Sequence, residues 1–193
     1  MKIIEKEVVR EIDASRAVVL WNYWDHEHLI VVHKNYTSAK IIYEDEKIAV
    51  YLLTFKLPVF SFLQSKSLNV MIQKNSNTIK VYNVGLFGLP SATTITVEEI
   101  GMDKSKITMN YKFVLTGWKL ILAPFLPKMI IKWNQQVWEE DFPLKIRRQK
   151  VLRDGFKDFI GLPKNVSERI FEDDLELILP IVRHVHSPVN FPL

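Results

Sequence analysis

The sequence predicts an α+β fold in which an antiparallel sheet wraps around a long C-terminal helix, with an apolar cavity between them. Two patterns support this fold class. Apolar and polar side chains alternate in residues 2–12 and in six further runs between residues 38 and 115, and a helical period then continues to about Arg153. A sheet with one apolar face needs a cover, and the late helix is long enough to provide it.

The first expected element is a strand over residues 2–12. Helical residues 13–33 follow, with Asp13 or Ser15 as the candidate N-cap. After Tyr36 the period becomes two, and short polar or glycine-bearing links separate the runs. The expected strands are residues 38–45, 47–57, 66–74, 78–86, 92–100 and 105–115.

The helical period returns beyond Gly117. Pro124 and Pro127 are expected to delay the regular helix until near Lys128, because proline lacks the backbone N–H. The candidate inward positions are Trp118, Leu120, Ile121, Met129, Ile130, Trp133, Val137 and Trp138.

The chain is expected to form one main domain with an added tail. The domain covers residues 1–154 and contains the sheet and the long helix, which Pro143 is expected to kink or restart just after Asp141. The C-terminal extension, residues 155–193, is expected to pack on the same domain and to hold one helical stretch that ends at Pro180.

The composition limits the function classes. The chain has no cysteine, which excludes disulfides, a thiol nucleophile and a cysteine-held iron–sulfur cluster. A net charge of +4 and a pI of about 9.1 fall short of a dedicated nucleic-acid binder, so no nucleic-acid partner is expected. We interpret the basic cluster at residues 145–153 as a solvated helix face, with a docking patch for an acidic partner as the alternative.

Residues 117–133 form the most apolar run, which lysines and prolines interrupt. A membrane-spanning helix needs about twenty predominantly apolar residues, so this run is not expected to span a bilayer. It remains a candidate for peripheral membrane contact or for closing over an apolar pocket. The first residues do not resemble a secretory signal, and a cytoplasmic location is expected.

Three of the five histidines lie in one short segment, where Asp25, His28 and His33 form the pattern Asp-x-x-His-x-x-x-x-His. Asp25 and His28 are neighbours on a helix. His28 and His33 are about 140° apart around a straight helix, so they can share a metal ion only if the helix ends, bulges or bends between them. The β-branched side chains of residues 30–32 weaken helical preference there.

Two histidines and one carboxylate that leave open coordination positions are typical of non-haem Fe(II) sites that activate dioxygen. The best candidate carboxylate is Asp141, beside the expected kink at Pro143, and Glu140 is the alternative on the neighbouring helix face. The candidate metal ligands are therefore His28, His33 and Asp141.

These motifs resemble the catalytic domain of Rieske-type non-haem iron oxygenases over roughly residues 1–153. The resemblance is carried by the histidine pattern and by the late-helix segment VWEED. It implies a helix-grip fold of the START and Bet v 1 type (SRPBCC), with His28, His33 and Asp141 as iron ligands. It also implies that Asp25 is the acid that bridges the iron site to the electron-donating cluster. The chain departs from the family because it lacks the cysteines of a Rieske domain.

The sequence therefore predicts an iron oxygenase that uses Fe(II) and acts on an apolar substrate in the cavity. A separate electron-transfer protein is the expected electron source, with the basic residues after Asp141 as its docking site, and a homo-oligomer is expected. The alternative is a START-like carrier of a lipid, quinone or pigment without catalysis. A third possibility is a metal-free cyclase or hydrolase that uses His28 with Asp25 as a general base pair.

The histidines and tryptophans also have simpler interpretations. His28 and His33 can be partly buried residues that are hydrogen-bonded within the first helices. His26 is expected to be exposed, and His184 and His186 to face solvent in the tail. The five tryptophans are mostly assigned to the core, and those near the histidines to the wall of an apolar pocket.

Overall fold

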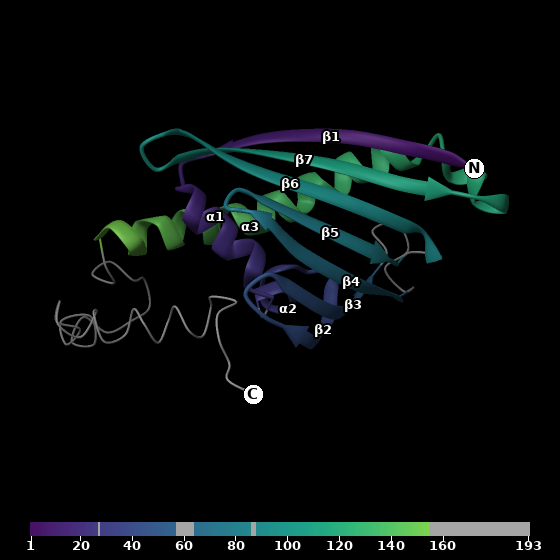
Figure 1. Ribbon diagram of the computed structural model, residues 1–193, viewed down its shortest axis with the longest axis horizontal. Helices are drawn as coiled ribbons and strands as arrows, with labels where there is room; N and C mark the ends of the chain where they lie inside the picture. Colours follow the sequence, from purple (N-terminus) through teal and green to yellow (C-terminus); the bar gives the residue numbers. More distant parts are fainter. Residues whose placement is uncertain (27, 57–63, 86–87, 155–193) are drawn as a thin grey trace.

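Seven antiparallel strands form one sheet in the computed structural model, which describes residues 1–26, 28–56, 64–85 and 88–154. Their order is β1-β7-β6-β5-β4-β3-β2, so the first and last strands of the described residues pair with each other (Figure 1). The strands are β1 (Lys2–Ile12), β2 (Tyr36–Glu44), β3 (Ile48–Lys56), β4 (Gln64–Asn75), β5 (Thr78–Val84), β6 (Pro90–Gly101) and β7 (Lys104–Leu115). Each lies close to an expected run, and the predicted strands are confirmed.

Two short helices, α1 (Arg16–Trp24) and α2 (His28–Val32), join β1 to β2. Ser15 is the N-cap of α1, and its hydroxyl accepts a hydrogen bond from the Val18 backbone N–H. Asp25 has φ −77° and ψ 86°, which are not helical angles, and it ends α1. The helical stretch expected over residues 13–33 is therefore broken into two helices.

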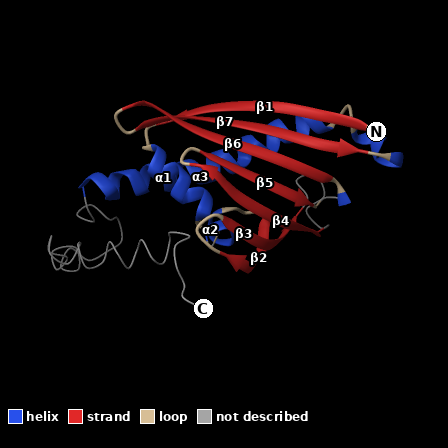
Figure 2. Cartoon of the chain, in the orientation of Figure 1, coloured by secondary structure: helices blue, strands red, loops and turns tan. Residues whose placement is uncertain are grey.

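The long helix α3 (Leu126–Asp154) runs across one face of the sheet and follows a 3-10 helix, η2 (Gly117–Leu122) (Figure 2). Pro127 lies in the first turn of α3, where a backbone nitrogen has no partner within the helix. The helix continues through Pro143, so the expected restart after Asp141 is wrong, and the expected kink stays a prediction. Proline removes one N–H bond there, and buried residues on both sides of it, Asn134 and Lys145 among them, hold the helix against the core.

The core fills the space between the sheet and the helices. On β3 every second residue is buried, at Ala49, Tyr51, Leu53 and Phe55, because alternate side chains point to the same face of a sheet. A smaller cluster at the start of α3 consists of Ile4, Leu89, Leu115, Ala123 and Leu126. This arrangement confirms the predicted fold class, an antiparallel sheet wrapped around a long C-terminal helix.

Three expected inward positions in η2 are wrong. Trp118, Leu120 and Ile121 are exposed, whereas Ile130 on α3 is buried. The physical reason is the tighter winding of the 3-10 helix, whose three residues per turn place side chains three apart on one ridge. Trp118 and Ile121 therefore share an outward ridge.

Among the described residues, no helix is long and apolar enough to cross a lipid bilayer. Residues 155–193 lie outside the described part of the chain. The expectations attached to them therefore stay predictions: the helical stretch before Pro180, the packing of the extension, and the placement of His184 and His186.

Candidate metal centre

The break between α1 and α2 brings the two candidate histidines to one place. α2 is a single turn that begins at His28 and ends at Val32, so His33 lies just beyond its end. The helix therefore ends between the two histidines, which is one of the conditions for a shared site. Their ring centroids lie 5.6 Å apart, and both side chains are buried.

Asp141 reaches the same point from the middle of α3. Its Oδ1 atom lies 3.2 Å from His28 Nε2 and 3.2 Å from His33 Nε2. One ligand atom from each of the three residues lies within 4.8 Å of the others. Neighbouring ligands held about 2.1 Å from a metal ion lie about 3 Å apart, so the two nitrogen–oxygen distances suit a metal site.

Hydrogen bonds on the far side of each ring leave the Nε2 atoms facing the carboxylate. The Nδ1 atom of His28 contacts the Asp25 backbone carbonyl, and that of His33 lies 2.9 Å from Glu140 Oε2. Each Nδ1 is therefore the protonated nitrogen that donates, which leaves Nε2 with a lone pair. Glu140, the alternative ligand in the sequence, instead orients His33.

This arrangement needs a cation. His28 Nε2 and Asp141 Oδ1 are buried and have no hydrogen-bond partner among the described residues. Two acceptor atoms that face each other repel unless a proton or a metal ion lies between them. The donor set and the orphaned atoms therefore fit an ion such as Fe(II), and the same atoms fit a protonated imidazole.

The protonated form is also favoured by the carboxylates. Burial lowers the pKa of His33, but the neighbouring carboxylates of Asp141 and Glu140 outweigh it, and the net effect is a raised pKa. Burial raises the pKa of Asp141, whereas His28, His33 and Lys145 hold it well below its usual value. Asp141 is therefore ionised, and a metal ion has to compete with a proton for His33.

The second oxygen of Asp141 is occupied by two donors. Lys145 Nζ donates to Oδ2 at 2.6 Å, and Asn22 Nδ2 donates to it at 3.2 Å. Lys145 is only 1% exposed and lies one helical turn after Asp141. Oδ1 is thus the atom that remains for a metal ion, which favours a carboxylate that binds through one oxygen.

Asp25 meets His28 differently from the expectation. It is the Asp25 backbone carbonyl that contacts His28, while its carboxylate pairs with Arg148 and lies 3.8 Å from the imidazole. Arg148 also donates to Asn22 Oδ1 at 2.7 Å. Asp25 is therefore linked to Asp141 through Arg148 and Asn22. A role as bridging acid stays a prediction.

The solvated face expected at residues 145–153 is wrong for two of its members. Lys145 is buried against Asp141, and Arg148 pairs with Asp25. The physical reason is the uninterrupted helix: residues three or four apart share a face, so Lys145, Arg148 and Gln149 follow Asp141 toward the interior. The spacing of four residues between Asp141 and Lys145, one helical turn, could have identified Lys145 as part of the site.

The cluster has an excess of negative charge. Asp25, Glu140 and Asp141 face two cations, Lys145 and Arg148, when both histidines are neutral. The remaining negative charge matches one proton on a histidine or part of the charge of a divalent metal ion.

His26 is buried rather than exposed, which corrects the sequence expectation. It is 3% exposed, and its ring lies 4.5 Å from the Tyr51 ring, centroid to centroid. The break after Asp25 turns the chain, so His26 points to the sheet and not along the outer face of a continuous helix. Burial first, and then His28, lower its pKa from 6.5 to about 4, against the opposing charge of Asp25.

The buried His26 predicts a loss of stability in mild acid. Below pH 6.5 the unfolded chain binds a proton at this residue that the folded protein does not bind until about pH 4. The free energy of unfolding should therefore fall by about 2 kcal/mol between pH 8 and pH 5 from this group. Urea unfolding of the wild type and of His26→Phe measures it: the variant should lose that part of the pH dependence. An equal slope in both proteins would contradict the assignment.

An apolar cavity of about 290 Å³ lies between the sheet and α3. Asp141 and Lys145 line one part of it, whereas His28 and His33 do not line it. Aromatic rings connect the two sites: Tyr36 lies 4.9 Å from His33, and Trp133 lies 5.1 Å from Phe55. Tyr36, Phe55, Trp133 and Trp138 all line the cavity, whereas Trp21 and Trp24, the tryptophans next to the histidines in the sequence, do not.

No protein-family model and no curated protein matches the sequence. Solved structures do match the fold. The Zhui aromatase/cyclase from Streptomyces sp. R1128 is 8% identical, with a TM-score of 0.62 over 79% of this chain and 98% of that one. A START superfamily protein from Mycobacterium smegmatis is 12% identical, with a TM-score of 0.58 over 78% and 98%.

A third similar structure is a point mutant of norcoclaurine synthase from Thalictrum flavum in complex with a transition-state analogue. It is 15% identical, with a TM-score of 0.57 over 77% of this chain and 98% of that one. At these identities the likeness concerns the fold alone, and the resemblance to Rieske oxygenases stays a prediction. The chain has the helix-grip fold of START and Bet v 1-like proteins.

Proposed function

We propose that this protein binds an apolar small molecule in the cavity between the sheet and α3. The observation that carries the proposal is the cavity itself, about 290 Å³ and lined mainly by apolar and aromatic side chains. Pockets for small molecules are typically concave and apolar, with a few polar groups that fix the ligand's orientation. The cavity is near the small end of the usual range.

A polar stripe on the sheet indicates what the ligand carries. Asn69 on β4 is paired in register with Asn83 on β5, which is paired with Ser91 on β6. All three line the cavity, and Ser91 Oγ donates to Asn83 Oδ1 at 2.5 Å. Amide and hydroxyl groups at one place in an apolar wall favour a ligand with a hydroxyl or carbonyl oxygen there.

The similar structures support this proposal at the level of the fold. One is an aromatase/cyclase and another is a synthase in complex with a transition-state analogue. Their folds thus accommodate small organic molecules or their reactions. For this chain we propose the coarser property, ligand binding.

Filling the cavity should abolish binding. Thr93 points into the cavity on β6, and Thr94 points to the opposite face of the sheet. Thr93→Phe is expected to weaken the binding of the apolar dye anilinonaphthalene sulfonate by at least tenfold, while Thr94→Phe leaves it unchanged. Native mass spectrometry of freshly purified protein should show an organic ligand that Thr93→Phe lacks. Equal dye binding and equal ligand content in both variants would contradict the proposal.

A second function is favoured by the cluster of His28, His33 and Asp141. The orphaned nitrogen and oxygen atoms support a mononuclear Fe(II) site, and Asp141 also lines the cavity. Fe(II) bound there would supply dioxygen chemistry of the oxygenase class, with electrons from a separate protein. Within this proposal Glu140 and the Asp25 carbonyl orient the imidazoles, and Asn22 holds the carboxylate.

Metal content tests the second function separately from the first. Protein purified without oxygen is expected to take up one Fe(II) per chain and to consume dioxygen only when loaded. A ligand in the cavity of a protein that takes up no iron would leave the carrier function standing and refute the oxygenase. Catalysis that chelators do not affect would instead favour the metal-free cyclase or hydrolase.

A further inference from the structure

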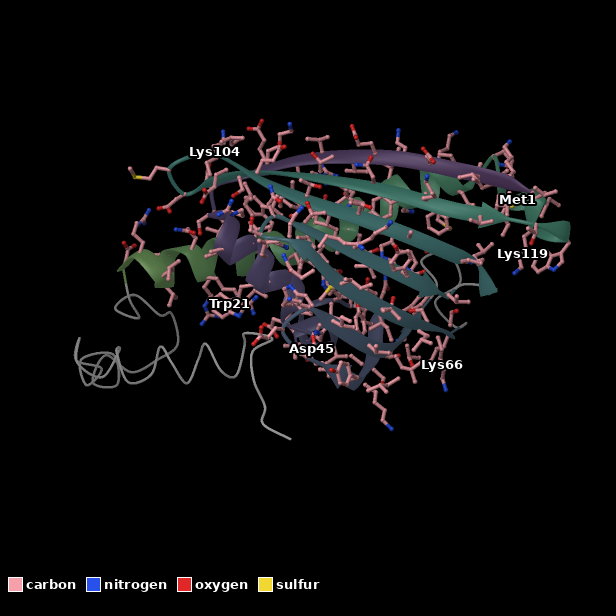
Figure 3. All side chains as sticks on the ribbon, in the orientation of Figure 1. Met1, Trp21, Asp45, Lys66, Lys104 and Lys119 are labelled. Atoms are coloured by element: carbon pink, nitrogen blue, oxygen red, sulfur yellow. The ribbon has the colours of Figure 1, made fainter. Side chains whose placement is uncertain are left out.

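Three large apolar side chains project into solvent at the start of the helical segment. Trp118, Ile121 and Phe125 are 67%, 70% and 66% exposed. We call these three residues the apolar rim. Figure 3 shows Lys119, which lies between the first two in sequence, at the end of the molecule near Met1 and away from Trp21. Large apolar side chains that gather on a surface often mark an interaction site.

The rim is held in place by the core beneath it. Leu122 and Ala123 pack with Leu126 in the smaller core cluster. Lys119 Nζ donates to the Gly88 carbonyl at 2.8 Å, which ties η2 to the sheet side of the fold. The segment that carries the rim is therefore fixed by packing and by this hydrogen bond, and the rim side chains are exposed in a defined position.

The surroundings of the rim are positively charged. The sequence holds no acidic residue between Asp103 and Glu139, although it holds six lysines there. On the sheet, Lys104 and Lys112 are neutralised by Glu11 and Glu5. In the described part of the chain, no acidic side chain pairs with Lys119, Lys128 or Lys132. The charges beside the rim are thus available to an external anion.

The rim also adjoins the cavity. Phe113 and Met129 line the cavity and pack against the cluster that carries the rim, and Leu89 belongs to both.

We propose that the apolar rim docks on the surface of an anionic lipid membrane. Apolar side chains that enter the interface and lysines that face anionic headgroups are the two components of peripheral membrane binding. A second copy of the chain is a poorer occupant, because its rim would bring the same positive charge against this one. Docking on the membrane does not depend on the proposed function. Exchange of the cavity ligand with the bilayer does rest on it.

Vesicle sedimentation tests the docking. Wild-type protein should bind vesicles of phosphatidylcholine with phosphatidylglycerol, and bind vesicles of phosphatidylcholine alone much more weakly. Trp118→Ser with Phe125→Ser should reduce binding at least tenfold. The matched control is Val31→Ser with Met102→Ser, which removes two apolar side chains that are 83% and 96% exposed elsewhere, and it should bind as the wild type does.

Charge and cavity variants complete the test. Lys128→Gln and Lys132→Gln should each weaken binding to anionic vesicles by about fivefold, with the wild type losing affinity as salt rises. Thr93→Phe should leave sedimentation unchanged, so failure of ligand binding and failure of docking are distinguishable. Vesicle binding that the rim variant retains would overturn the proposal. A wild-type dimer in solution that the rim variant dissociates, without vesicle binding, would overturn it in favour of a second copy.

Discussion

Asp141→Ala is expected both to abolish metal uptake and to destabilise the metal-free protein by about 3–5 kcal/mol. The variant removes the ligand that both histidines face at 3.2 Å, and it strips the buried Lys145 of its counter-ion. An unpaired buried charge accounts for the predicted loss of stability. His28→Ala should also abolish uptake but cost less stability, because it removes no partner of Lys145.

Two further variants separate the metal site from folding. Asp141→Asn keeps the shape and an oxygen for Lys145, so it should fold better than Asp141→Ala and still take up no metal. Asp141→Ala combined with Lys145→Met should recover much of the lost stability, because it removes the unpaired cation and replaces it with an apolar side chain of similar length. Metal analysis and urea unfolding of each protein measure the two effects. Normal Fe(II) content in any variant that lacks Asp141 would refute the site.

The strands and the long helix could be predicted because their signals are local. Alternation on β3 and β7 follows from one buried face, and the period of α3 from its inward stripe. The outward turn of Trp118 could not be predicted, because a helical period of 3.6 and a 3-10 period of three place it on different faces over so short a segment.

Part of the candidate site could be predicted from the sequence. The spacing of His28 and His33 required a break between them, and the structure has one at the end of α2. The residues that contact the candidate ligands could not be predicted, because these contacts depend on tertiary packing. In the sequence, Lys145 lies in a basic segment and looks solvated; it is buried because α3 continues past Pro143. His26 was misplaced for a similar reason, since the direction of the chain after Asp25 is set by contacts with β3.

The charge of Lys145 should weaken metal binding, so removing this charge is expected to raise the metal affinity strongly. Its ammonium group lies 2.6 Å from Asp141 Oδ2, on the carboxylate that a metal ion would share through Oδ1. Charges about 5 Å apart at an effective dielectric constant of about 20 interact by about 3 kcal/mol per unit charge. Lys145 also lies over the rings of Tyr23 and Trp138, at 5.2 Å and 5.7 Å, so a methionine of similar length can retain the apolar contacts.

Lys145→Met is therefore expected to raise the affinity for Zn²⁺ or Co²⁺ at least tenfold while destabilising the metal-free protein. The two effects have one cause, since the variant leaves Asp141 with an uncompensated negative charge that only a bound cation neutralises. Lys132→Met, an exposed change on the same helix, is the control and should alter neither quantity. Isothermal titration calorimetry and urea unfolding with and without metal measure both. A lower metal affinity in Lys145→Met would mean that Lys145 supports metal binding. It would contradict the prediction that the charge of this lysine weakens metal binding.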